Sequence, residues 1–112
     1  MTRTLGAPMI VEERIYRLYP KKVGEFLRIY EEEGFAVHSK ILGNLIGYFT
    51  TDVGHLNQVV HFWGFKSHND RAQRRARLLK NKEWNACVDR LVPLIISQEN
   101  RILIPTQFSP IR

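Results

Sequence analysis

The sequence predicts one α+β domain in which strands and helices follow one another in the order β-α-β-β-α-β. Two observations support this: short runs of β-branched and aromatic residues, and apolar residues that recur at every third or fourth position between those runs. The length of 112 residues fits a single domain, because single domains cluster at about 100–150 residues. We expect residues 1–8 to form a flexible tail and residues 9–112 to form the domain.

The first half of the chain supplies three strands and one interrupted helix. Pro20 ends the first strand and suits the first turn of a helix, where its missing N–H is not needed. In order, the expected elements are a strand at Met9–Tyr19, a helix from Lys21, a break at Glu31–Gly34, a short helix at Phe35–Leu42, and strands at Leu45–Thr51 and Asn57–Phe65.

The second half supplies a broken helix and a last strand. Ser67 and Asp70 have the spacing of a capping box, so a helix starts at Ser67. Asn81 interrupts this helical segment, and Pro93 ends it because proline lacks the donor N–H. The last strand is expected at Arg101–Gln107. This is the split βαβ, ferredoxin-like order, with the second helical segment broken in two and a four-stranded antiparallel sheet.

Helices cover one face of such a sheet and leave the other face bare. A bare face that carries apolar and aromatic groups needs a partner. Two copies packed face to face would close a dimeric α+β barrel. We therefore expect a homodimer.

Alternation along Asn57–Phe65 separates two kinds of side chain. Val60 and Phe62 share an apolar face, which we assign to the helices. His61 and Trp63 share a face with Asn57 that mixes aromatic and hydrogen-bonding groups, and we assign that face to the barrel interior between the two sheets.

The same alternation in the first strand places Arg14 and Tyr16 beside His61 and Trp63, although Glu13 and Arg17 then fall on the expected core face. The predicted ligand-binding residues are Arg14, Tyr16, Asn57, His61 and Trp63. His61 and Tyr16 are the candidate catalytic groups, because imidazole titrates near neutral pH and a phenol can donate a proton. Arg14 could hold a carboxylate or enolate. The alternative, which we favour on the pattern alone, is that His61 and Trp63 fill a dimer core with their polar atoms hydrogen-bonded.

The net charge of +6 is concentrated between Lys66 and Arg90, where eight Lys/Arg residues face three acids. Such a stripe can bind nucleic acid. The residues that would do so are Arg71, Arg74, Arg75, Arg77 and Lys80. Leu78 interrupts their shared helical face, so we favour a solvated helix surface over nucleic-acid binding.

Several other functions lack support in the sequence. The four histidines, His38, His55, His61 and His68, have no metal-ligand spacing, and we expect neither a metal nor a cofactor. No segment approaches the roughly 20 apolar residues of a membrane span. Cys87 is the single cysteine, which favours a reducing compartment, and residues 1–8 contain no signal peptide. We expect a cytoplasmic protein.

Six separate blocks resemble the NIPSNAP family, and the likeness extends from Met9 to Pro110. The matching blocks are Glu13–Tyr16, Glu31–Gly34, Leu42–Phe49, Leu56–Trp63, Asp70–Arg71 and Ser97–Arg101. The resemblance implies a dimeric α+β barrel, similar in fold to small cofactor-free monooxygenases and haem-degrading enzymes. It implies no settled activity and no proven catalytic residues. Some eukaryotic relatives are associated with mitochondria and with vesicle or mitophagy signalling. Because this sequence shows no convincing transit peptide, we do not extend the mitochondrial location to it.

Two classes of function remain open at this stage. One is a homodimeric barrel that binds a small ligand without chemistry. The other is a cofactor-independent, monooxygenase- or isomerase-like enzyme acting on a small aromatic or carbonyl substrate. An open pocket near His61 would favour the enzyme, and a filled one would disfavour it.

Overall fold

The structure is a computed structural model and describes residues 9–112. The predicted tail at residues 1–8 lies outside the described residues. The strands are β1 (Ile10–Leu18), β2 (Leu45–Thr50), β3 (Gln58–Phe65) and β4 (Ile95–Leu103). The helices are α1 (Val23–Ile29), the π-helical turn η1 (Tyr30–Gly34), α2 (Phe35–Leu42), α3 (His68–Leu79), α4 (Lys82–Leu91) and the 3-10 turn η2 (Val92–Leu94).

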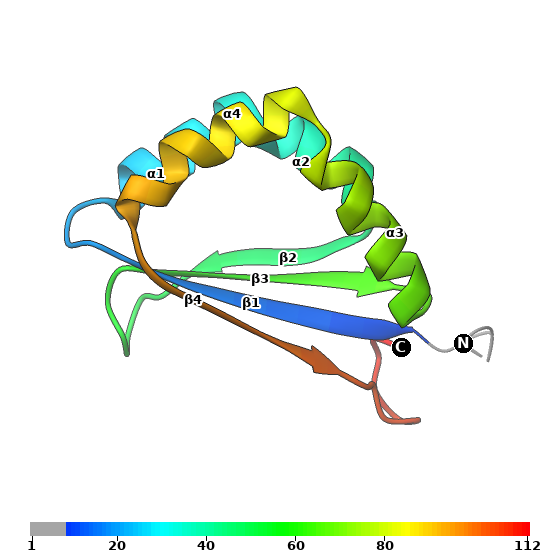
Figure 1. Ribbon diagram of the computed structural model, residues 1–112. Coiled ribbons are helices and arrows are strands. Elements are labelled where there is room, and N and C mark those ends of the chain that lie inside the picture. Colours follow the sequence, from blue (N-terminus) through cyan, green and yellow to red (C-terminus); the bar gives the residue numbers. More distant parts are fainter. Residues whose placement is uncertain (1–8) are drawn as a thin grey trace.

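The strands form one antiparallel sheet in the order β2-β3-β1-β4. The helices arch over one face of this sheet, as Figure 1 shows. This arrangement confirms the predicted α+β, ferredoxin-like fold, including the helical segment that is broken into α3 and α4.

Helix caps lie close to their predicted places. The Ser67 hydroxyl accepts a hydrogen bond of 3.0 Å from the Asp70 backbone N–H and caps α3. Asn81 does not merely interrupt the segment, because its side chain accepts a 2.8 Å bond from the Trp84 N–H and starts α4. These two local bonds explain why the break was visible in the sequence.

Two predicted boundaries are wrong. Lys21 has a φ of 67°, so Pro20 and Lys21 form a turn and α1 begins at Val23. The last strand begins at Ile95 rather than Arg101 and ends at Leu103 rather than Gln107. Its polar stretch Ser97–Asn100 is held in the sheet by pairing with β1, which overrides weak strand propensity.

The helices cover the face of the sheet opposite to the predicted one. Val59, Trp63 and Phe65 are buried beneath the helices, where they pack in the apolar core, and His61 is buried on the same face. Asn57 does not belong to this face, because it lies before β3 with a left-handed φ of 62°. The sequence analysis correctly placed His61 and Trp63 on one face together with Arg14 and Tyr16. It assigned this face to the barrel interior, however, and the face is the helix-covered core.

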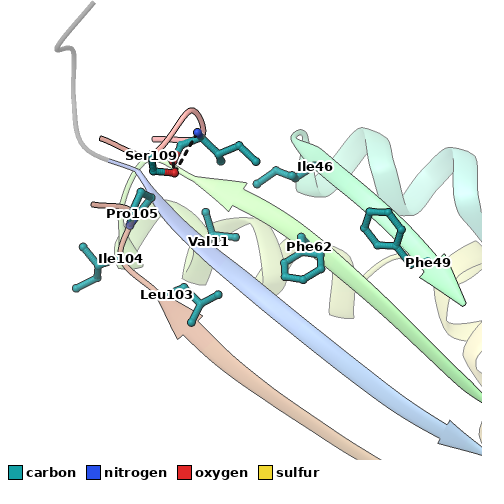
Figure 2. Close-up of a pocket in the computed structure, with 9 residues that line it drawn as sticks. Val11, Ile46, Phe49, Phe62, Leu103, Ile104, Pro105 and Ser109 are labelled. Atoms are coloured by element: carbon teal, nitrogen blue, oxygen red, sulfur yellow. Dashed lines mark hydrogen bonds between the residues drawn. The ribbon is translucent and has the colours of Figure 1, made fainter. Parts of the chain in front are cut away.

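The uncovered face is apolar at one end. Figure 2 shows Val11, Phe62 and Leu103 side by side on neighbouring strands, with Phe49 on β2 nearby. These side chains and the segment that follows β4 enclose a groove of about 340 Å³. It is lined by Val11, Ile46, Phe49, Phe62, Leu103, Ile104, Pro105, Ser109 and Ile111.

Candidate functional site

A row of polar side chains crosses the sheet, beneath the helices on β1, β2 and β3 and exposed at its end on the edge strand β4. Strand pairing places Tyr48 on β2 opposite His61 on β3, His61 opposite Arg14 on β1, and Arg14 opposite Asn100 on β4. Directly paired residues on one face have Cβ atoms about 4.5–5.5 Å apart. We call these four residues the polar row. The predicted proximity of Arg14 to His61 is therefore present, on the covered face.

Glu12 supplies the negative charge beside this row. Its residue exposure is 0%, and its carboxylate accepts bonds of 2.9 and 2.8 Å from Arg71, 2.9 Å from Arg14 and 2.8 Å from Asn100. Burial alone would raise the pKa of Glu12, but these hydrogen bonds and the two arginine charges lower it to about 2. Glu12 is therefore a buried carboxylate that ties β1 to β4 and α3.

Arg14 is held by two neighbours on its own strand. It donates to Glu12, and its Nε donates to the Tyr16 hydroxyl oxygen at 3.0 Å. Burial opposes the charge of Arg14, yet Tyr16 and Glu12 raise its pKa above the ordinary value. Arg14 thus has an acid partner within the protein and does not require an anionic ligand to neutralise it.

His61 has one satisfied ring nitrogen and one unsatisfied ring nitrogen. The Trp63 indole N–H donates to His61 Nδ1 at 2.6 Å, so the proton of a neutral ring lies on Nε2. Tyr48 stacks on the ring at 4.4 Å, and Tyr16 meets it edge-on at 5.0 Å. Nε2 is buried without a hydrogen-bond partner among the described residues. Burial, assisted by the charge of Arg14, lowers the pKa of His61 to about 3.

A second histidine lies above His61 on α2. His38 Nδ1 shares a 2.6 Å hydrogen bond with the Tyr30 hydroxyl, and its ring stacks on Trp84 at 4.1 Å. Burial lowers the pKa of His38 to about 2, with further lowering from the charges around it. Both histidines are therefore neutral at physiological pH, so His61 acts as a hydrogen-bond donor and is a weak base.

A cavity of about 40 Å³ lies between the sheet and the helices at this point. Its lining includes Tyr16, Tyr48, His61, His38 and Val88. Gln98, on the edge strand β4, also lines it. A space of this size holds one water molecule or a very small group. Side chains therefore fill most of the pocket that the sequence predicted near His61.

Arg75 on α3 extends toward the same region. Its charge acts on His38, Glu12 and Arg14. Burial lowers the pKa of Arg75, and the charges of Arg14 and Arg71 lower it further. Within residues 9–112, Arg75 has no ion pair and no hydrogen bond from its side chain.

The basic helix is therefore not a uniformly solvated surface. Arg71 and Arg75 are four residues apart and share a helix face with buried Leu78, whereas Arg77 is exposed. The sequence contained this signal, because an apolar residue on the arginine face indicates that the face points toward the protein. The sequence analysis also missed Glu12, His38 and Asn100, whose partners lie far away in the chain.

No three His, Cys, Asp or Glu side chains of residues 9–112 lie close enough together to hold a metal ion. None of the helices in the described part of the chain has the length and apolar character needed to cross a membrane.

These features define a ferredoxin-like α+β domain with a polar site covered by helices. The chain belongs to the NIPSNAP family, whose model matches residues 11–110. A NIPSNAP family protein of Agrobacterium tumefaciens is 53% identical, with a TM-score of 0.96 over 99% of this chain and 97% of that one. An uncharacterized NIPSNAP-like domain protein of Burkholderia xenovorans is 51% identical, with a TM-score of 0.90 over 93% and 90% of the two chains.

Curated relatives are longer. Protein NipSnap of Drosophila melanogaster is 34% identical over 90% of this chain, and the match covers 36% of its own length. The Dictyostelium discoideum homolog is 35% identical over 86% of this chain and 42% of its own length. The chain thus spans roughly two-fifths or less of these proteins.

A more distant likeness concerns the fold alone. A putative antibiotic biosynthesis monooxygenase from Nitrosomonas europaea shares 10% identity, with a TM-score of 0.67 over 96% of this chain and 99% of that chain.

Proposed function

We propose that this domain works as a homodimer that binds a small molecule between its sheet and its helices, at the polar row. The observation that supports a ligand site is the buried Nε2–H of His61, which has no hydrogen-bond acceptor within residues 9–112. A buried donor without an acceptor costs about 1–3 kcal/mol. A ligand acceptor atom, or a water that the ligand displaces, would offset this cost. The proposed site thus replaces the predicted one between the two sheets.

The second part of the proposal is the dimer. The uncovered sheet face exposes Phe49 at 55%, next to partly buried Phe62. Contiguous apolar surface of this kind marks an interaction site. A second copy is the partner that buries the same face on both molecules. The single cysteine supports a reducing, cytoplasmic location as part of this proposal.

Filling the cavity tests the ligand site. Val88 lines the cavity from α4, and Val88→Leu adds one methylene to it. We expect any metabolite that raises the melting temperature of the wild-type protein to lose that effect in Val88→Leu. Val53→Leu is the matched control, because Val53 is 90% exposed in the loop before β3. A metabolite panel without effect on the wild type, or with equal effect on both variants, would contradict the proposed site.

A second candidate is the cofactor-independent enzyme, which the nearly filled pocket near His61 disfavours. A neutral imidazole N–H close to a guanidinium suits a carbonyl or enolate oxygen, which is the charge that develops when a carbonyl substrate loses an α-proton. The low pKa of His61 makes it a poor base for removing that proton. Incubation of small ketones and aromatic substrates in D₂O, followed by NMR, separates the two classes, since only an enzyme would catalyse exchange that His61→Gln abolishes.

A further inference from the structure

We infer that the ligand of this site is an anion, a carboxylate or a comparable oxyanion. Its oxygen accepts a hydrogen bond from the Nε2–H of His61, and its charge is balanced by Arg75. This inference rests on the proposed ligand site and adds its chemical class. It also assigns a role to an arginine of α3 that the sequence placed on a solvated surface.

The first argument is the count of charges around the polar row. Arg14 and Arg71 both pair with the single carboxylate of Glu12. That carboxylate already accepts four hydrogen bonds, the fourth of them from Asn100. Arg75 is partly buried one helical turn after Arg71, on the same face of α3, and adds a third positive charge within electrostatic reach of Glu12. It has no ion pair within residues 9–112. Three guanidinium groups thus share one carboxylate, which leaves an excess of positive charge.

The second argument is the cost of that excess. A partly buried guanidinium beside other guanidinium groups is unfavourable unless something neutralises it. Burial and the charge of Arg14 both disfavour the protonated form of Arg75. An anion reverses this cost, whereas a cationic ligand would increase it.

The third argument is the direction of the hydrogen bond. Because Trp63 donates to Nδ1, the free ring nitrogen of His61 presents a proton and cannot accept one from a ligand. Asn100 and Gln98 lie on the same face of β4, opposite Arg14 and Tyr16. A buried N–H donor in a positive field is the combination that recognises carboxylate and other oxyanions.

The two tryptophans provide a direct readout. Trp63 donates its indole N–H to His61, so a ligand on Nε2 changes the electron density at Nδ1 and shifts the Trp63 indole signal. The protein contains two tryptophans, and Trp84→Phe assigns their indole ¹⁵N–¹H signals. The probes are formate and acetate, which are small enough for the cavity, with formamide and acetamide as neutral counterparts of similar shape, titrated into the full chain at constant ionic strength.

We expect formate or acetate to shift the Trp63 signal in the wild type, and the neutral amides to bind at least about tenfold more weakly. Arg75→Gln should weaken binding of the anion by about tenfold or more, and Arg77→Gln, on the exposed side of the same helix, should leave it unchanged. Without ligand, Arg75→Gln should melt at a higher temperature than the wild type, because it removes repulsion from Arg14 and Arg71. A residue with a merely structural role would lower the melting temperature instead.

The outcomes separate the inference from the proposal on which it rests. The anion inference is overturned if the amides bind as tightly as the carboxylates, or if Arg75→Gln and Arg77→Gln bind the anion with equal affinity. Either result would leave the proposed ligand site standing. A wild-type Trp63 signal that responds to none of the four probes overturns the anion inference, and the ligand site itself falls if the metabolite panel also has no effect on melting.

Discussion

At the scale of single residues, the site depends on how a buried polar group finds its partners. Glu12 is fully buried and stable because Arg71 and Asn100 reach it from elements 59 and 88 residues further along the chain. His61 is satisfied on one side by its near neighbour Trp63 and unsatisfied on the other. Sequence spacing can reveal the second kind of contact but not the first, because distant partners are brought close by the fold.

The two buried histidines predict a pH dependence of stability. In the unfolded chain a histidine titrates near pH 6.5, whereas the folded-state pKa values are about 3 for His61 and about 2 for His38. Their contribution is complete above about pH 6.5 and is lost as pH falls toward the folded values, because the unfolded state binds protons first. Between pH 7.5 and 5.5, the free energy of unfolding in urea should fall by about 1.4 kcal/mol for each histidine.

Glu12 does not interfere in this window. Its folded-state pKa is about 2, against an ordinary value of 4.5 for a glutamate, so its contribution is lost only below about pH 4.5. His61→Gln, which places a neutral amide there, should remove about half of the loss between pH 7.5 and 5.5. His55→Gln, in an exposed loop, should leave the loss intact. A free energy that stays constant over this range in the wild type would show that the histidines are not buried as neutral groups.

At the scale of elements, local signals predicted most of the fold. Capping by Ser67 and Asn81 and the end of α4 at Leu91, just before Pro93, depend on contacts within a few residues, and the sequence shows them. β4 was placed too late because Ile95–Asn100 contains few strand formers and is held by pairing with β1. Pairing partners of this kind are not visible in a local pattern.

The covered face of the sheet was the larger error, and it has a physical cause. Alternation tells which residues share a face but not which face the helices cover. Polarity suggested that His61 and Arg14 would face away from the helices, and the fold buries them by supplying Glu12, Arg71 and His38. Glu13 and Arg17 gave the contrary signal, since charged residues on the other face indicate a side without helices.

The π-helical turn η1 yields a prediction of its own. A Cβ atom added to Gly34 would lie 2.6 Å from Cys87 Sγ and 3.1 Å from Trp84 Cζ3. Gly34→Ala should therefore lower the free energy of unfolding by about 1–3 kcal/mol through overpacking. Gly24→Ala is the control, because nothing lies within 4 Å of its added Cβ in α1. It should stabilise the protein by about 0.5–1 kcal/mol.

A double-mutant cycle isolates the clash. Cys87→Ala removes the sulfur that Gly34→Ala would meet, so the double variant should be more stable than the sum of the two single changes predicts. Additive effects in equilibrium denaturation would mean that η1 and α4 move apart freely, contrary to the tight packing between Gly34 and Cys87.

At the scale of the whole molecule, the domain is a two-layer slab. Its extents are 43 × 35 × 22 Å, and its radius of gyration of 15.1 Å exceeds the roughly 13 Å of a compact chain of this length. The short dimension corresponds to one sheet and one layer of helices, each about 10 Å thick. A slab with helices on one side leaves the other side of its sheet in water, which is costly where that side is apolar.

The homodimer predicts that a charge on the uncovered face will separate the copies. Phe49 is 55% exposed and meets Phe62 edge-on at 6.1 Å, so in a face-to-face dimer both copies would bury it. Sedimentation equilibrium of the wild type at micromolar concentration should give twice the chain mass of 13.2 kDa. Phe49→Asp should give the chain mass, because each dimer would bury two unpaired carboxylates at several kcal/mol each and weaken association by at least about a hundredfold. Val53→Asp, on the exposed loop, should remain dimeric. A wild type that sediments as one chain would refute the dimer, and a dimeric Phe49→Asp would move its interface to another surface.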